Sequence, residues 1–270
     1  MEKNYKILNA HSHIFPEKVS EKATKAIGEF YDIPMDLVGN SKDLIVDGNK
    51  VGILKHIICS SATTPRQVKA INDFITYEAE HNKEFIPLGT LHPYMEDFIE
   101  EVERIVQKGV KGLKIHPDFQ KFPADEDKAI EMYKVASKYN LPILFHAGDK
   151  TSDLSSPHRI RKICDKVPDL RIIAAHFGGH QSWDEVIPTL KHSNIYFDTS
   201  SSLPFITKEM ALNFINYFGA ERFMFGTDFP MWNAEDELQR FFNLELSEEE
   251  NKIILYDNAL KIYNLDESTF

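Results

Sequence analysis

The sequence has 270 residues, of which 42% are hydrophobic and 27% charged, and this composition indicates a folded globular protein and excludes a disordered chain. The formal net charge of −11 argues against a nucleic-acid partner, which would require a basic surface to neutralise phosphates. The sequence shows no signal peptide, no apolar run long enough to span a membrane and no disulfide framework, so we expect a cytoplasmic protein without a membrane partner.

Short apolar segments alternate with longer amphipathic segments along the chain. The apolar segments, which we predict to be strands, are residues 5–10, 56–60, 85–91, 110–116, 142–146, 171–176, 194–199 and 223–228. The predicted helices are residues 65–81, 95–108, 125–139, 157–167, 183–191, 208–218, 233–242 and 247–263. The last of these begins with a capping box, Ser247 with Glu250 three residues on. Residues 17–55 are too long for a simple crossover and predict an extra element, with a turn at 47–49.

Eight strand–helix repeats predict a parallel sheet that closes into a (β/α)₈ TIM barrel, with a small insertion after the first strand. Such a barrel needs about 250 residues, so we expect one domain covering residues 1–270. The alternative is an open, doubly wound sheet, which would usually carry a glycine-rich phosphate turn after its first strand. His11 and His13 stand at that place instead, and they favour the barrel.

Histidines and one aspartate gather where the predicted strands end. In a barrel of this kind the carboxyl ends of the strands meet at one mouth, where the active site lies. His11 and His13 are separated by two positions and therefore project from the same face of their strand. An acid at the end of an apolar strand is costly unless it is paired or binds a cation, which makes Asp228 informative. The composition of the strand ends is that of a metal site, and its members are His11, His13, His116, His146, His176 and Asp228.

These residues stand in motifs that resemble the amidohydrolase superfamily, specifically the amidohydrolase-2 family with its aminocarboxymuconate-semialdehyde decarboxylase-like members. The motifs are residues 9–13 (NAHSH), 112–117 (GLKIHP), 145–148 (FHAG), 175–179 (AHFGG), 225–230 (FGTDFP) and 256–259 (YDNA). The resemblance implies that His11, His13, His146 and Asp228 bind one divalent metal ion. It also implies that His176 is catalytic or supports the metal ligands.

A metal site of this composition predicts a metal-dependent hydrolase. Zn²⁺ suits three histidines and one aspartate, although Mn²⁺ and Fe²⁺ also fit. The metal would activate a water molecule, and Asp228 would accept its proton and deliver it to the leaving group. His176 would orient the water molecule or polarise the substrate carbonyl. We therefore expect hydrolysis of a small-molecule ester, lactone or amide.

Two other functions stay open. The resemblance also admits a non-oxidative decarboxylase of a small unsaturated or aromatic acid, in which Lys114 and Arg159 could grip the carboxylate. Lys114 could instead become carbamylated and bridge two metals, as in other branches of the superfamily. A binding protein with a structural metal is disfavoured, because structural zinc sites do not lie at a catalytic mouth. We further predict substrate contacts from His116 and Phe15, and a homodimer is an option that matches the symmetry preference of soluble enzymes.

Overall fold

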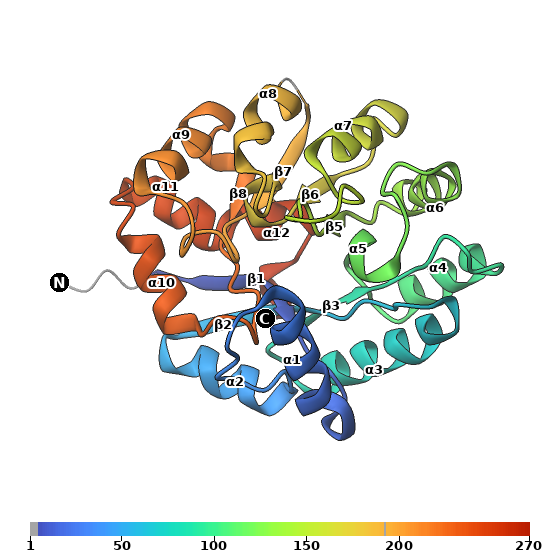
Figure 1. Cartoon of the computed structure of the whole chain (residues 1–270). Helices are drawn as coiled ribbons and strands as arrows, with labels where there is room; N and C mark the ends of the chain where they lie inside the picture. The colour runs from blue at the N-terminus through green and yellow to red at the C-terminus, as the bar shows by residue number, and fades with distance from the viewer. Residues whose placement is uncertain (1–4, 192) are drawn as a thin grey trace.

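Eight parallel strands form the centre of the molecule and helices surround them (Figure 1). The computed structural model describes residues 5–191 and 193–270. The strands follow one another around the sheet in chain order, as in a (β/α)₈ TIM barrel, which confirms the predicted fold. They are β1 (Ile7–His13), β2 (Ile53–Cys59), β3 (Phe85–Gly89), β4 (Gly112–Ile115), β5 (Ile143–Phe145), β6 (Ile172–Ala174), β7 (Ile195–Asp198) and β8 (Phe223–Met224).

The helices lie mainly between consecutive strands, on the outside of the barrel (Figure 1). The α-helices are α1 (Glu17–Tyr31), α2 (Ser41–Lys50), α3 (Val68–His81), α4 (Phe98–Gln107), α5 (Pro117–Gln120), α6 (Asp127–Lys138), α7 (Pro157–Lys166), α8 (Val186–Leu190), α9 (Lys208–Phe218), α10 (Ala234–Phe242), α11 (Glu248–Lys252) and α12 (Asn258–Ile262). Short helical turns are η1 (Pro65–Gln67), η2 (His176–Gly178), η3 (Trp183–Glu185), η4 (Ala220–Arg222), η5 (Ile253–Asp257) and η6 (Glu267–Thr269). The predicted capping box of Ser247 and Glu250 is present at the start of α11. Among the described residues, no helix combines the length and apolar character that crossing a bilayer requires.

The barrel closes through the segment that follows β8 rather than through a long strand. β8 has only two residues, and the chain beyond it turns at Asp228, whose φ is 57°. Three backbone hydrogen bonds join this segment to β1: Ala10 N to Phe225 O at 2.8 Å, Asp228 N to His11 O at 2.9 Å, and His13 N to Phe229 O at 2.7 Å. The closing seam therefore runs between the segment that contains His11 and His13 and the segment that contains Asp228.

Alternation along the strands separates two apolar layers. Side chains such as Leu8, Ile57, Leu144 and Ile173 fill the interior of the barrel, together with residues of η5 and α12. Their strand neighbours point outward and pack against the surrounding helices. The β1–β2 register shifts between Asn9 and Ser12, a bulge-like irregularity at the motif that carries His11.

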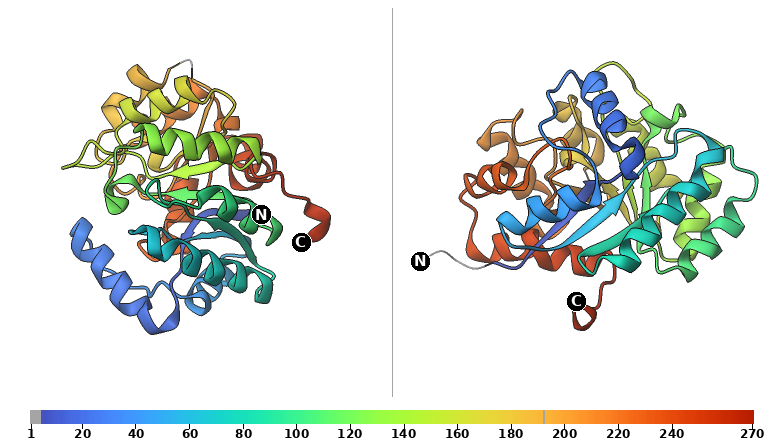
Figure 2. Two further views of the ribbon diagram at one scale, coloured as in Figure 1. Left: turned by 90° about the vertical axis from the view of Figure 1, so that its right-hand side faces the viewer. Right: turned by 90° about the horizontal axis from the view of Figure 1, so that it is seen from below.

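The insertion after β1 contains two helices, α1 and α2. In the right-hand view of Figure 2, α1 and the C-terminus lie at opposite ends of the barrel. The turn predicted at 47–49 is wrong, because these residues belong to α2, which begins after the capping residue Asn40. Gly48 serves close packing instead: a Cβ atom there would lie 2.4 Å from Nε2 of the buried His56.

Several strands are shorter than predicted, because they end at polar residues or at residues with a left-handed backbone conformation. β6 ends at Ala174, and His176 and Phe177 then adopt positive φ values of 61° and 53°. Such values are uncommon for residues other than glycine. They turn the chain into the short helical turn η2 instead of extending the strand.

Replacing Gly48 with alanine tests the packing of α2. Helix propensity alone would favour alanine by about 1 kcal/mol. We expect Gly48→Ala instead to lower the free energy of unfolding by about 1–3 kcal/mol, because the new methyl group overlaps the His56 ring. Chemical denaturation measures the change. Asn49→Ala, at an exposed position of the same helix, is the matched control, and a stabilised Gly48→Ala variant would contradict this explanation.

Candidate metal centre and active-site cavity

A cavity of about 280 Å³ opens at the mouth of the barrel. The α1 helix forms one wall, through Ala23, Ala26, Ile27, Phe30 and Tyr31. The strand ends and the loops after them form the rest, through His13, Phe15, Ser61, Thr63, His116, Phe119, His146, His176, Asp228, Pro230 and Met231. Six of the residues predicted to form the site therefore line one cavity, namely His13, Phe15, His116, His146, His176 and Asp228.

Three potential ligand atoms converge at the closing seam. The distance from His11 Nε2 to His13 Nε2 is 3.1 Å, and Asp228 Oδ1 lies 3.4 Å and 3.2 Å from these two nitrogens. Metal–ligand distances of 2.0–2.2 Å place neighbouring ligand atoms about 3.0–3.5 Å apart. Electron-rich atoms at this separation need a cation between them or a proton shared among them. The donor set thus fits a divalent ion.

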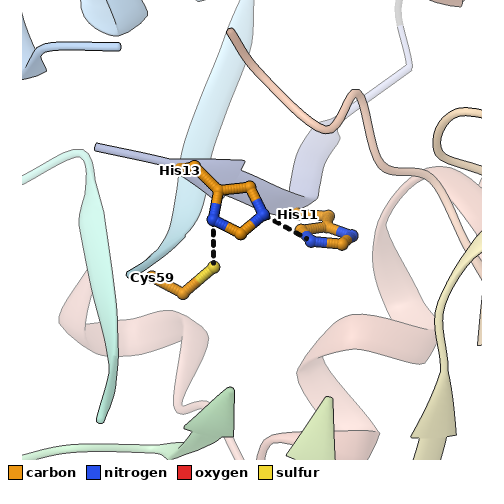
Figure 3. A group of neighbouring side chains, drawn as sticks. All are labelled: His11, His13 and Cys59. Atoms are coloured by element: carbon orange, nitrogen blue, oxygen red, sulfur yellow. Dashed lines mark hydrogen bonds between the residues drawn. The ribbon is translucent and has the colours of Figure 1, made fainter. Parts of the chain in front are cut away.

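The outer nitrogens of both histidines are held by neighbouring side chains. His11 Nδ1 is 2.8 Å from Asp198 Oδ2, a contact in which the imidazole donates and the carboxylate accepts. His13 Nδ1 is 3.6 Å from Cys59 Sγ, and the Cys59 thiol in turn donates to Ser12 O at 3.4 Å. Figure 3 shows His13 between His11 and Cys59. These partners accept the Nδ1 protons of the two rings and turn both Nε2 atoms toward Asp228.

His146 is oriented by a chain of hydrogen bonds through His176. His176 Nδ1 is 3.1 Å from the carbonyl oxygen of Ser200, which can only accept, so this nitrogen carries the proton. His176 Nε2 must then accept, and His146 Nδ1 donates to it at 3.1 Å. The chain leaves His146 Nε2 unprotonated, with a lone pair that a metal ion could use.

Asp228 is held by its second oxygen. Ser201 Oγ donates to Asp228 Oδ2 at 2.6 Å, and Trp232 Nε1 donates to Ser201 Oγ at 3.0 Å. Burial alone would raise the pKa of Asp228, but His11 and His13 outweigh this effect and hold the pKa well below its usual value. Asp228 is therefore a carboxylate with Oδ1 directed at the two histidines.

The cavity histidines differ in their proton affinity. Burial lowers the pKa of His176 to about 3 and lowers the pKa values of His116 and His146 well below the usual value, so these three rings are neutral. His13 is the exception. Burial also lowers its pKa, but Cys59 and Asp228 outweigh burial and raise it to about 9.

His116 belongs to a stack of flat side chains beside this centre. Its ring lies 3.9 Å from the ring of Phe119 and 3.9 Å from the ring of His146, nearly parallel to both. The Tyr31 hydroxyl group lies at the edge of the stack, 3.1 Å from His116 Nε2 and 3.5 Å from His146 Nε2. Burial raises the pKa of Tyr31 well above its usual value, so the hydroxyl group stays protonated.

Two predicted substrate contacts lie elsewhere. Lys114 is fully buried inside the barrel, and its Nζ approaches His11 Nε2 at 2.9 Å. The strand-face ambiguity between Lys114 and His116 is thereby resolved, because both point inward and only His116 lines the cavity. Arg159 belongs to α7, where its guanidinium group contacts Asp125 and Asp153 at 2.5 Å and 2.8 Å. The structure does not bring Arg159 to the cavity, because these two carboxylates hold it outside.

Four residues that sequence reasoning missed support the centre. Asp198 ends β7, so the same signal that indicated Asp228, an acid at the end of an apolar strand, could have identified it. Cys59 ends β2, where a single cysteine in an apolar strand carries no distinctive signal. Ser201 follows the end of β7 without a distinctive motif. Tyr31 carries no sequence signal, since its position over the mouth depends on the path of the insertion.

Taken together, the barrel and the donor set at its mouth define a metal-dependent enzyme of the TIM-barrel type. Residues 59–265 match the family model described as amidohydrolase, and the chain belongs to this amidohydrolase-2 family. A comparison with curated protein sequences finds no match.

Solved structures share the fold at low sequence identity. The 5-carboxyvanillate decarboxylase from Sphingomonas paucimobilis is 15% identical with a TM-score of 0.75, over 97% of this chain and 100% of that chain. A dihydroxybenzoic acid decarboxylase from Polaromonas sp. JS666, with bound manganese and the inhibitor 2-nitroresorcinol, is 17% identical with a TM-score of 0.77, over 99% of each chain. A protein from Pseudomonas putida, provisionally named a 2-pyrone-4,6-dicarboxylic acid hydrolase, is 13% identical with a TM-score of 0.70, over 98% of this chain and 99% of that chain.

Metal content tests the donor set directly. We expect about one divalent ion per chain in protein purified without chelator, and we expect the ion to be lost from the His11→Ala, His13→Ala double variant, because two of the converging nitrogens disappear. Elemental analysis measures the content. The matched control is the double variant of two exposed histidines, His81→Ala and His158→Ala, which should retain the metal. A stoichiometry of two would instead favour a bridged, binuclear centre.

Metal affinity should depend on pH. The metal competes with the proton on His13, whose pKa is raised to about 9, so binding at pH 7 should release about one proton per ion. The apparent affinity should rise about tenfold per pH unit between about pH 7 and 9, because the metal-free imidazole loses its proton only near the upper limit. Calorimetric titration in buffers of different ionisation enthalpy counts the protons. Binding without proton release would contradict the raised pKa.

Proposed function

We propose that the protein is a metal-dependent non-oxidative decarboxylase of a small aromatic or unsaturated carboxylic acid. One observation carries the proposal: a compact histidine and aspartate donor set meets walls of flat and apolar side chains in a single cavity. Phe15, Phe30, Tyr31 and Phe119 supply the aromatic surface. The cavity suits a flat molecule with an oxygen-rich end that faces the metal ligands and a ring that faces the aromatic side chains.

We further propose that His11, His13, His146 and Asp228 hold one divalent ion, Mn²⁺ or Zn²⁺. The three imidazoles each present an Nε2 lone pair, and the carboxylate adds a charged oxygen. When bound, the ion would supply a positive charge that holds an oxygen-rich end of the substrate and stabilises the negative charge that builds up on the ring as CO₂ leaves. In this proposal residues 1–270 act as one catalytic domain.

The chain's own residues divide the remaining work. Phe15, Phe119 and the α1 residues exclude water from the substrate ring, and desolvation of a carboxylate favours its loss as neutral CO₂. The bond from the ring to the carboxylate breaks, its electron pair stays on the ring carbon, and a proton is delivered to that carbon. Asp228 is the carboxylate among the described cavity residues. We assign to its Oδ1 a relay: it accepts a proton from a substrate hydroxyl group or a water molecule and passes this proton to the ring carbon. His176 keeps His146 in the required tautomer.

The sequence alone favoured hydrolysis, and this preference is reversed here. The support comes from the apolar walls of the cavity, together with the decarboxylases among the structures of similar fold. Hydrolysis of a lactone or ester is the second candidate, because Asp228 and His176 face the same cavity and one structure of similar fold carries a hydrolase name. The two reactions differ in their products, so one assay separates them.

Product analysis tests the proposal. Protein loaded with Mn²⁺ or Zn²⁺ is incubated with hydroxybenzoic acids and, in parallel, with pyrone lactones and aryl esters. We expect CO₂ release from at least one hydroxybenzoic acid, and in D₂O one deuterium on the carbon that carried the carboxylate. Asp228→Asn should lower the rate about 10²-fold or more, because proton transfer is lost. The exposed Asp169→Asn variant is the control.

Hydrolysis of a lactone or ester without any CO₂ release would contradict the decarboxylase and favour the second candidate. Binding can be followed independently of turnover with 2-nitroresorcinol, a nitrophenol that has no carboxylate to lose. We expect this compound to bind only to the metal-loaded protein, and its yellow phenolate absorbance gives a direct titration.

A further inference from the structure

Tyr31 is the one polar side chain that the inserted helix α1 contributes to the cavity. Figure 1 shows α1 in front of the barrel mouth. The Tyr31 hydroxyl group reaches the barrel histidines from that side, 3.1 Å from His116 Nε2 and 3.5 Å from His146 Nε2. The reaction proposed above gives this hydroxyl group no role, although it lies beside His146, a proposed metal ligand.

The two hydrogen bonds of the His116 ring fix the direction of the Tyr31 hydroxyl proton. His116 Nδ1 accepts a hydrogen bond from the backbone N–H of Phe119 at 3.4 Å, so the neutral ring carries its proton on Nε2. His116 Nε2 then donates to the Tyr31 oxygen. Tyr31 is therefore the acceptor in this contact, and its own proton is left for another acceptor.

The remaining neighbour cannot serve as that acceptor once a metal is bound. His146 Nε2 is the second contact of the Tyr31 hydroxyl group, and its lone pair is the one that the proposed metal site uses. A lone pair that is shared with a metal ion no longer accepts a hydrogen bond. The hydroxyl proton must then point to whatever occupies the cavity beside His146.

We propose that Tyr31 is a substrate-binding residue, whose hydroxyl group donates a hydrogen bond to an anionic oxygen of a flat substrate bound beside His146. The substrate class rests on the proposed function, whereas the hydrogen bond itself requires only an oxyanion next to the metal ligands. A phenolate or carboxylate oxygen has the required chemistry. His116 acts as a positioning residue, because it engages the Tyr31 oxygen and directs the proton away from itself.

Aromatic packing holds Tyr31 in this position. Phe30 and Phe119 meet edge to face with ring centres 4.8 Å apart, and the Tyr31 and Phe119 rings lie 5.9 Å apart. These contacts join the end of α1 to α5, which directly follows His116. The hydroxyl group is thus fixed before a substrate arrives, which reduces the entropy cost of the new hydrogen bond.

The test compares Tyr31→Phe with wild-type protein, both loaded with Mn²⁺. The substitution keeps the ring and its packing and removes the hydroxyl group. We expect the Kd of 2-nitroresorcinol to increase about tenfold or more, since hydrogen bonds to charged acceptors have that strength. The manganese content and the manganese Kd should be unchanged. Tyr217→Phe, at an exposed position of α9, is the matched control and should leave the Kd of 2-nitroresorcinol unchanged.

A second variant tests the role of His116. His116→Leu should weaken binding of 2-nitroresorcinol by a smaller factor than Tyr31→Phe. The double variant should bind about as weakly as Tyr31→Phe alone, because His116 acts through the Tyr31 hydroxyl group. If the Kd of the double variant instead increases by the product of the two single factors, His116 does not act through Tyr31 and its positioning role is wrong.

The outcomes separate this inference from the proposed function. If Tyr31→Phe binds 2-nitroresorcinol as tightly as wild type, the inference is wrong whether or not the protein decarboxylates. The same conclusion holds if wild-type protein shows no metal-dependent binding of the compound. If the Kd depends on Tyr31 but no acid loses CO₂, the hydrogen bond stands and the decarboxylase proposal fails.

Discussion

The convergence of electron-rich atoms at the closing seam is the constraint on which the rest of the site depends. His11 Nε2, His13 Nε2 and Asp228 Oδ1 lie 3.1–3.4 Å from one another in the buried interior of a barrel. Such an arrangement is repulsive unless positive charge lies among or beside these atoms, and the chain itself brings one basic group to them, Lys114 Nζ at 2.9 Å from His11 Nε2. The contacts of Asp198, Cys59 and Ser201 have one common effect. Each holds one side chain of the cluster in its orientation toward the other two.

The residues that close the barrel also bring the donor set together. The backbone hydrogen bond from Asp228 N to His11 O belongs to the seam, and the side chains of the same two residues belong to the donor set. β8 is short, and the chain turns at Asp228, whose φ is positive, at the point where its carboxylate lies beside the histidines.

The strand order and most residues of the mouth could be predicted from the sequence. The reason is that the carboxyl ends of parallel strands all lie at one end of the barrel, so histidines and an aspartate at those ends must gather there. Its failures have physical reasons. Arg159 lies in the segment between β5 and β6, but ion pairs with Asp125 and Asp153 hold its guanidinium group outside the cavity. Local sequence patterns do not reveal such ion pairs. The glycine at 48 was interpreted as a turn residue, although it allows α2 to approach His56. Tyr31 could not be found, since the path of residues 17–40 is set by tertiary packing.

The origin of the cavity walls has a consequence for how such a protein can change over evolutionary time. The proposed ligand set comes from the repeated barrel, whereas five lining residues come from α1, which lies outside the repeat. Drift or replacement of that one helix alters the shape and polarity offered to a ligand without disturbing a single strand end. The proposed ligands and one wall of the cavity are thus encoded in separate stretches of the chain, and selection can revise that wall while the ligands stay intact.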